Sequence, residues 1–395
     1  MCEGTIADTV LRNGKIFTID PGQPWVEAVG IAGDRFCFVG SNDEARQIIG
    51  AGARILDLNG AFVMPGFNDA HIHFRASMLP ALCEFGITTA QTISDPNDVP
   101  DYVRLAGDGQ LTTRLEVRLP IETWRDYPKY KTIANETNGM VNVNGLKGYV
   151  DGVFRNRSAF LLAPYRNAPF QCGSLSKTAA DAVLFDQLLS GALSVGADIS
   201  VHAIGDAGVR ALLGHYKGLT NSNPNGWLRL RVAHASLVSP ADFPKFGELK
   251  LIAEVNPYHA TAVPWLRTII GGERVRWAFP FRSLKAHGAL LCFSSDHPGP
   301  IEGNEFPLNP FLGIQAAVLH ENPEQRVSLK EALEAYTIAP AIASRQDGNK
   351  GNIEVGRLAD LIVLCANPFA IPSGQIRSIR VAMTIVGGKE VYRER

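Results

Sequence analysis

The sequence predicts an α/β protein: a (β/α)8 TIM barrel joined to a small β-module that both chain ends build. Two observations carry this prediction. The middle of the chain alternates apolar, β-like runs with helical ones, and both ends consist of short strands with little helical period. The 395 residues are enough for a barrel of roughly 250–300 residues plus a smaller module. We expect the module at residues 1–60 and 351–395 and the barrel at residues 61–350.

Both ends of the chain are predicted to contain short strands joined by tight turns. Near the N-terminus, the hairpin dipeptide Asn13-Gly14 separates two such strands, and a short helix from Asn42 to Ile49 interrupts the series. Near the C-terminus, a Gly387-Gly388 turn joins the last two strands. Because chain ends often lie close together in space, the two ends can form one module with the barrel inserted between them.

The barrel prediction depends on eight apolar runs of strand length. Helical periodicity between them is clear at residues 178–194, 207–219 and 329–344. Neither G-x-G-x-x-G nor a P-loop follows the first run, so the sequence lacks the motifs that usually accompany a nucleotide-binding open sheet. The predicted strands are residues 61–68, 87–93, 114–120, 145–150, 197–203, 228–234, 249–255 and 288–295.

Composition and charge give no support to several classes of partner. The net charge is −1 and 19% of the residues are charged, which gives no reason to expect nucleic acid or an anionic membrane surface as a partner. No run approaches the ~20 apolar residues of a membrane span. The N-terminus has no basic stretch followed by an apolar one, so we expect a cytoplasmic protein. Its six cysteines form no C-x-x-C pair and are expected to be buried thiols in a reducing compartment.

Five side chains of metal-ligand type fall at the ends of predicted strands. Each has a structural explanation when taken alone: a buried histidine with a satisfied hydrogen bond, or an aspartate that caps the next segment. In a barrel, however, the carboxyl ends of all strands form one rim, where active sites lie. Their joint position therefore predicts a metal centre. The five are His71, His73, His202, His234 and Asp296.

The residue types explain the chemistry. Neutral imidazoles and a carboxylate are good ligands for Zn²⁺ and similar cations. In an extended His71-Ile72-His73, both rings point to the same side. A bound metal lowers the pKa of its water toward about 7 and polarises a carbonyl group. A carboxylate such as Asp296 can then take the proton and pass it to the leaving group.

Lys147 is a sixth candidate, because a lysine inside a barrel strand is costly to bury as an ammonium. If neutral, its amine can take up CO₂ and become a carbamate that bridges two metals. The alternative is a lysine that pairs with Asp151 or points to solvent. His215, His287 and His320 are interpreted as surface or packing residues.

These motifs resemble the amidohydrolase superfamily, and within it the amidohydrolase 3 or YtcJ-like subgroup, which includes N-substituted formamide deformylase. The resemblance spans nearly the whole chain. It is carried by residues 57–60 leading into 63–73, and by residues 86–89, 146–152, 201–206, 232–234, 294–296 and 356–361.

The resemblance implies a role for each candidate. His71 and His73 correspond to ligands of one metal, and His202 and His234 to ligands of a second. Lys147 corresponds to a carbamylated residue that bridges the two. Asp296 corresponds to a ligand that also acts as acid and base. The module at the chain ends corresponds to a small β-sandwich.

The sequence departs from the subgroup in three places. Only Phe74 to Phe85 separate His73 from the next strand, where relatives carry a long segment that shapes the substrate pocket, so we expect a more open site. His297 follows Asp296 where an aromatic residue is commoner. Asn256 stands where glutamine is commoner, and the nearby His259 is interpreted either as polarising the substrate carbonyl or as lining the pocket.

The expected function is hydrolysis of a C–N bond in an amide, N-acyl or cyclic amide substrate, by water that one or two Zn²⁺ or similar ions activate. Three alternatives remain open. They are an ester, lactone or phosphoester hydrolase on the same centre, a non-catalytic barrel that serves as a binding module, and a metal-dependent isomerase or deaminase acting on a ring. The expected partner is a small molecule, and a homo-oligomer is compatible with the sequence.

Overall fold

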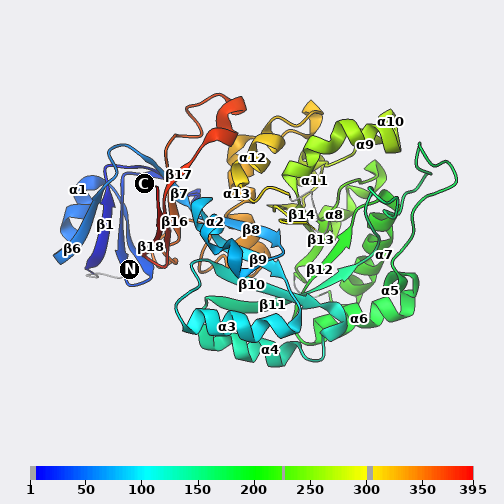
Figure 1. Cartoon of the computed structure of the whole chain (residues 1–395), viewed down its shortest axis with the longest axis horizontal. Coiled ribbons are helices and arrows are strands. Elements are labelled where there is room, and N and C mark those ends of the chain that lie inside the picture. The colour runs from blue at the N-terminus through cyan, green and yellow to red at the C-terminus, as the bar shows by residue number, and fades with distance from the viewer. Residues whose placement is uncertain (1–5, 225–226, 300–305, 395) are drawn as a thin grey trace.

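The computed structural model describes residues 6–224, 227–299 and 306–394. Figure 1 shows two parts: a small β-module at one end, which holds both termini, and a larger α/β part. The larger part is a nearly closed barrel of eight parallel strands in sequential order, which confirms the predicted fold class. Its strands are β8 (Phe67–Ile72), β9 (Ile87–Ile93), β10 (Arg114–Pro120), β11 (Val141–Tyr149), β12 (Asp198–Ala203), β13 (Leu230–His234), β14 (Ile252–Val255) and β15 (Leu290–Phe293).

Helices follow the strands and cover the outside of the barrel (Figure 1). Two of the predicted helices are interrupted. The first breaks at Asp181, whose side chain caps the second segment by accepting from the Leu184 amide. The barrel helices are α2 (Leu79–Glu84), α3 (Val99–Gly107), α4 (Tyr127–Ala134), α5 (Lys177–Ala180), α6 (Ala182–Ser194), α7 (Asp206–Ser222), α8 (Lys245–Glu248), α9 (Val263–Ile270), α10 (Gly272–Val275), α11 (Phe281–Ala286), α12 (Pro310–Val318), α13 (Leu329–Ala335) and α14 (Ile338–Ala343).

The β-module consists of two sheets that share one apolar core. The first sheet is built from the N-terminal end alone, whereas the second combines strands from both ends of the chain. The first contains β1 (Ala7–Arg12), β4 (Ala28–Ala32), β5 (Arg35–Gly40) and β6 (Ile49–Asp57), with α1 (Asn42–Ala45) between the last two. The second contains β2 (Lys15–Phe17), β3 (Trp25–Val26), β7 (Phe62–Pro65), β16 (Leu361–Leu364), β17 (Val381–Val386) and β18 (Lys389–Arg393).

The expected first barrel strand, residues 61–68, is wrong as a single element. Its first half is β7, which pairs with β2 and β16 of the module, and the barrel strand β8 begins only at Phe67. The chain changes sheets at Gly66, where a Cβ atom would lie 2.1 Å from the Thr88 side chain. His71 consequently lies inside β8 rather than after it.

The prediction that the cysteines are buried is correct for only some of them. Cys83 and Cys292 are buried, whereas Cys37 and Cys172 are half-buried and Cys365 is exposed. Cys2 lies outside the described residues.

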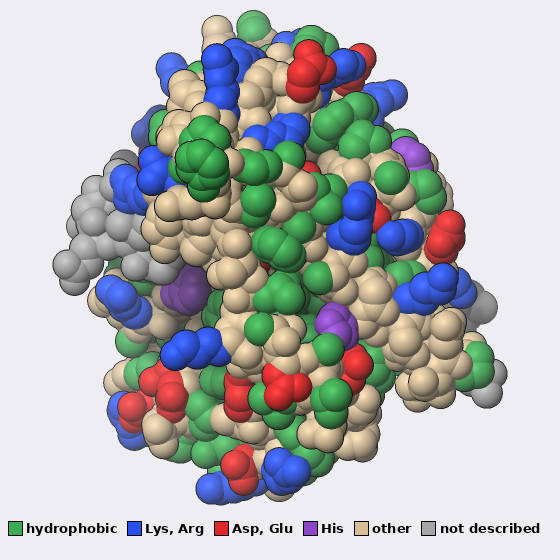
Figure 2. All heavy atoms as spheres, turned by 90° about the vertical axis from the view of Figure 1, so that its right-hand side faces the viewer, with side chains coloured by type: hydrophobic (Ala, Val, Ile, Leu, Met, Phe, Trp, Pro, Cys, Tyr) green, Lys and Arg blue, Asp and Glu red, His purple; other side chains and the backbone are tan. Residues whose placement is uncertain are grey.

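The surface view in Figure 2 shows Lys and Arg side chains interspersed with Asp and Glu, with hydrophobic side chains between them. In the part of the chain that the structure describes, no helix has the length and apolarity needed to cross a bilayer.

Candidate metal centre

The barrel closes where its first and last strands carry ligand-type residues. The Asp296 amide donates to the His71 carbonyl at 2.9 Å, and the His73 amide donates to the His297 carbonyl at 2.8 Å. Buried Asp69 accepts from the amides of both His71 and Ser295, at 3.1 and 3.0 Å. The seam between β8 and β15 is therefore fixed at the end of the barrel that bears His71, His73 and Asp296.

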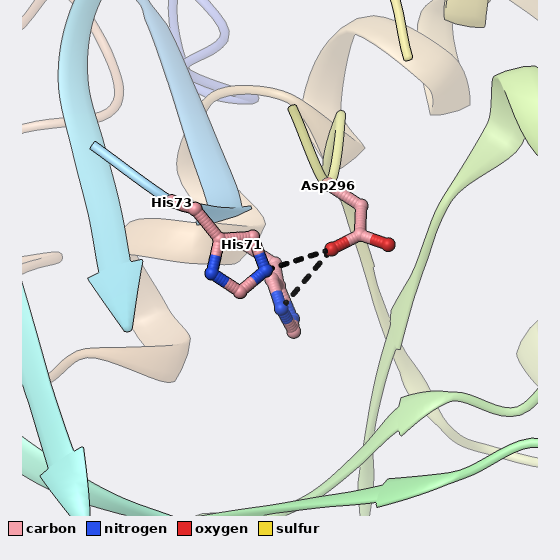
Figure 3. A group of neighbouring side chains, drawn as sticks. All are labelled: His71, His73 and Asp296. Atoms are coloured by element: carbon pink, nitrogen blue, oxygen red, sulfur yellow. Dashed lines mark ion pairs between the residues drawn. The ribbon is translucent and has the colours of Figure 1, made fainter. Parts of the chain in front are cut away.

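Figure 3 shows these three side chains pointing toward one another. The Nε2 atoms of His71 and His73 lie 3.4 and 3.3 Å from Asp296 Oδ1. One ligand atom from each residue falls within 4.8 Å of the others, which suits a single metal ion. His71 and Asp296 are buried, while the His73 side chain is 35% exposed, so solvent reaches the cluster from that side.

His202 and His234 extend the cluster from the neighbouring strands β12 and β13. Their ring centres lie 4.6 Å apart, and the His234 ring lies 5.0 Å from that of His71. His234 Nδ1 contacts Asn256 Oδ1 at 2.7 Å, and His202 Nε2 contacts the Gly152 carbonyl at 3.1 Å. If each of these nitrogens donates its proton there, Nε2 of His234 and Nδ1 of His202 keep a free lone pair for a metal.

The backbone is unusual at two of these residues. His234 has a φ of 72° and Asp296 a φ of 59°, in the left-handed region that residues other than glycine rarely adopt. Such conformations persist where surrounding contacts hold them, and they concentrate at functional sites.

Burial keeps His71, His202 and His234 in the neutral form. Burial, assisted by the charge of Lys147, lowers the pKa of His71 to about 3 and that of His202 to about 4. Burial and the neighbouring His202 hold the pKa of His234 well below its usual value. Burial acts to raise the pKa of Asp296, but the hydrogen bond with His73 and the adjacent His234 outweigh it and keep this carboxyl ionised. The result is a set of imidazoles and one carboxylate in their metal-binding forms.

Lys147 lies inside β11, only 1% exposed, and its Nζ atom has no hydrogen-bond partner among the described residues. Burial lowers the pKa of Lys147 to about 7. The alternative partner, Asp151, is occupied otherwise: it accepts from the amides of Phe160, Ile204 and Gly205. Lys147 is therefore neither paired with Asp151 nor turned to solvent.

His259 lies in the 3₁₀ turn Pro257–Ala262 that follows β14. The centre of its ring lies 3.9 Å from that of Phe306, with the two rings tilted by 38°, and Nε2 is buried with no hydrogen-bond partner in the described part of the chain. Burial lowers the pKa of His259. Both interpretations of His259, carbonyl polarisation and pocket lining, fit this position.

Of the three histidines interpreted as surface or packing residues, His215 contacts the Asp186 carboxylate, His287 is exposed, and His320 is buried against Phe281.

The barrel beneath the centre is filled by charged side chains that were not predicted from the sequence. Glu254 of β14 is fully buried and contacts His71, Arg118 of β10 and Arg231 of β13. Burial acts to raise the pKa of Glu254, but Arg118 and His71 outweigh it and hold the pKa well below the usual range. A signal was present, because a charged residue inside an apolar strand such as 251–255 is rarely buried without a partner.

Comparison with known proteins identifies the family of the chain. Residues 75–392 match the model of the amidohydrolase family, so the chain belongs to that family. It is 28% identical to protein LONG AFTER FAR-RED 3 of Arabidopsis thaliana, over 78% of this chain and 52% of the relative. It is also 28% identical to the putative amidohydrolase YtcJ of Bacillus subtilis, over 74% and 55%, and to the N-substituted formamide deformylase of Arthrobacter pascens, over 50% and 37%.

The chain thus spans about half the length of the curated relatives it matches. Among solved structures, a metal-dependent hydrolase from Pyrococcus furiosus superposes with a TM-score of 0.75 at 22% identity, covering 91% of this chain and 99% of the other. That likeness supports the fold.

Proposed function

We propose that this protein is a metal-dependent hydrolase that cleaves a C–N bond in an amide, N-acyl or cyclic amide substrate. The observation that carries the proposal is the convergence of His71, His73 and Asp296 within 4.8 Å, beside two further neutral imidazoles. The family name and the deformylase relative both refer to amide chemistry.

The residues present fit one or two Zn²⁺ ions. His71, His73 and Asp296 would hold one ion, and His202 and His234 a second. Lys147 supports this assignment, because its buried amine has a pKa of about 7 and no hydrogen-bond partner among the described residues, and such an amine beside these histidines can become an anionic carbamate ligand. When bound, the metal supplies an activated water and polarises the carbonyl to be attacked.

The chain's own residues carry the proton and orient the substrate. Asp296 is ionised and stands beside both His71 and His73, so its carboxylate can take a proton from the attacking water and return it to the leaving nitrogen. The buried Nε2 of His259 can donate to the substrate carbonyl. A small-molecule substrate and a cytoplasmic location are part of the same proposal.

The test is Asp296→Asn in protein reconstituted with Zn²⁺. We expect hydrolysis to fall by about 10²-fold or more, the usual contribution of a general acid–base group. Metal content, measured on the same sample, separates loss of the proton carrier from loss of the ion. Full activity of the variant with metal bound would show that the mechanism is wrong.

The bond that is cleaved can be tested with matched pairs of substrates. An N-formyl amine, an N-acetyl amine and a lactam are compared with the corresponding esters and lactone, and stripping the metal should abolish turnover of whichever is accepted. Faster turnover of every ester than of its matched amide would replace the amide proposal with ester hydrolysis. Release of ammonia from a ring substrate would instead indicate a deaminase.

A further inference from the structure

The interior of a TIM barrel is normally filled by apolar side chains, yet this barrel holds a fully buried carboxylate next to a candidate ligand. Glu254 Oε1 lies 2.7 Å from His71 Nδ1. Its other oxygen, Oε2, accepts from Arg118 at 2.5 Å and from Arg231 at 3.1 Å. Burying these charges is costly, and apolar replacements of similar volume are often no less stable. A contribution to stability alone therefore does not explain why Glu254, Arg118 and Arg231 are buried here.

The contact between Glu254 and His71 fixes which nitrogen of the ring carries the proton. An ionised carboxylate only accepts hydrogen bonds, so Nδ1 of the neutral His71 ring must be the donor. The lone pair then belongs to Nε2, the nitrogen that faces Asp296 Oδ1 at 3.4 Å. Glu254 thus presents His71 to the centre in its ligand form.

Glu254 is itself held firmly. Arg231 is fixed by Gln91 Oε1 at 2.7 Å and by the Ala343 carbonyl at 2.9 Å. Arg118 donates to Glu254 through one nitrogen and to the carbonyl of Ala70 through the other. Since Ala70 precedes His71, one guanidinium group restrains both the backbone and the ring partner of this histidine.

We propose that Glu254 is a positioning residue for metal binding, which sets the tautomer and the ring orientation of His71. The inference rests on the proposed metal centre. Partners of this kind, which bind the second nitrogen of a ligating histidine, typically change metal affinity by about 10- to 100-fold.

The test variant is Glu254→Gln. The amide oxygen should turn to Arg118 and Arg231, which are both donors, and this places the amide NH₂ against His71 Nδ1. That contact favours the wrong tautomer, with the proton on Nε2. We expect Co²⁺ and Zn²⁺ affinity, measured by competition with a chelator, to fall about 10- to 100-fold. Nitrogen-15 NMR of the His71 ring in the metal-free protein should show the proton moving from Nδ1 to Nε2.

Glu116→Gln is the matched control. Glu116 of β10 is also buried in the barrel and pairs with Lys350 at 2.5 Å, but among the described residues it forms no hydrogen bond or ion pair with a candidate ligand. A general cost of losing a buried charge should lower the stability of both variants, whereas only Glu254→Gln should lose metal affinity. If Glu254→Gln does not fold, the double variant Glu254→Gln/Arg231→Gln restores the charge balance. Its metal affinity is then compared with that of the unaltered protein, and the same loss of about 10- to 100-fold is expected.

The outcomes separate the two proposals. If the unaltered protein takes up no Co²⁺ or Zn²⁺, the metal centre itself is wrong, and the role of Glu254 with it. If the unaltered protein binds metal and the folded Glu254 variant binds it equally tightly, with the same Co²⁺ absorption spectrum, only the role of Glu254 is overturned.

Discussion

At the scale of single residues, Lys147 has an environment unlike that of an ordinary, solvent-exposed lysine. Its amine is buried with no hydrogen-bond partner in the part of the chain that the structure describes, and burial brings its pKa to about 7, with Arg118 and Arg231 acting in the same direction. Much of the amine is therefore neutral near pH 7. A neutral amine can attack the carbon of CO₂; a C–N bond forms, one C–O π pair moves onto oxygen, and a proton is released.

We predict that Lys147 is carbamylated in the metal-bound protein. Exposure to carbon-13 bicarbonate should give a carbamate NMR signal that is absent from Lys147→Met, a variant of similar volume. Lys350→Met is the control, because Lys350 is also buried but pairs with Glu116 and should contribute nothing to the signal. A carbamate signal that persists in Lys147→Met would contradict the assignment.

The sequence pointed to His71, His73, His202, His234 and Asp296 because residue type and position at a strand end were both visible in it. Glu254 acts through contacts with His71 and Arg118, which come from other strands and meet only when the barrel closes. The left-handed backbone of His234 and Asp296 is likewise invisible in residue types.

At the scale of elements, the predicted bounds were wrong where a run passes between two sheets or where the backbone leaves the helical conformation. Residues 61–68 form one apolar run, and periodicity could not show that the run passes from one sheet to another at Gly66. The helix predicted from 329 to 344 divides into α13 and α14, because Thr337 between them adopts a non-helical backbone. Strands and helices that begin and end within one sheet or layer, such as β9 and α7, were predicted to within a few residues.

The start of α7 gives a prediction about packing. A Cβ atom on Gly205 would lie 2.0 Å from the Phe160 carbonyl oxygen, and the Gly205 amide donates to Asp151. We expect Gly205→Ala to lower the free energy of unfolding by about 1–3 kcal/mol through overpacking, measured by urea unfolding.

Gly214, in the same helix, provides the control. It is exposed, and a Cβ there would meet nothing within 4 Å. Gly214→Ala should therefore raise the free energy of unfolding by about 0.5–1 kcal/mol, since alanine loses less backbone entropy in a helix. Equal effects of the two alanines would show that the contact with Phe160 is not what constrains Gly205.

At the scale of the whole molecule, the module and the metal centre lie at opposite ends of the barrel strands. Asp360, just before β16, forms two hydrogen bonds with Arg114, at 2.8 and 3.0 Å, where β10 begins. Asp360 also accepts from the Gly387 amide and, through its carbonyl, from Gly66. Figure 1 shows β16 and β17 on the side of the module that faces the barrel. One buried ion pair thus joins the two chain ends to the barrel, at the end away from the ligands.

This arrangement predicts that stability and metal binding can be separated. Arg114→Met leaves the buried Asp360 carboxylate without its cation, and both side chains are about 5% exposed or less. We expect the free energy of unfolding to fall by about 3–5 kcal/mol. Arg104→Met, which breaks exposed pairs with Asp101 and Asp108, should cost no more than about 1 kcal/mol. Because the contact lies at the opposite end of the strands from His71 and Asp296, the folded Arg114 variant should bind Zn²⁺ as tightly as the unaltered protein. Reduced Zn²⁺ affinity in that variant would show that the module and the centre are coupled through the barrel.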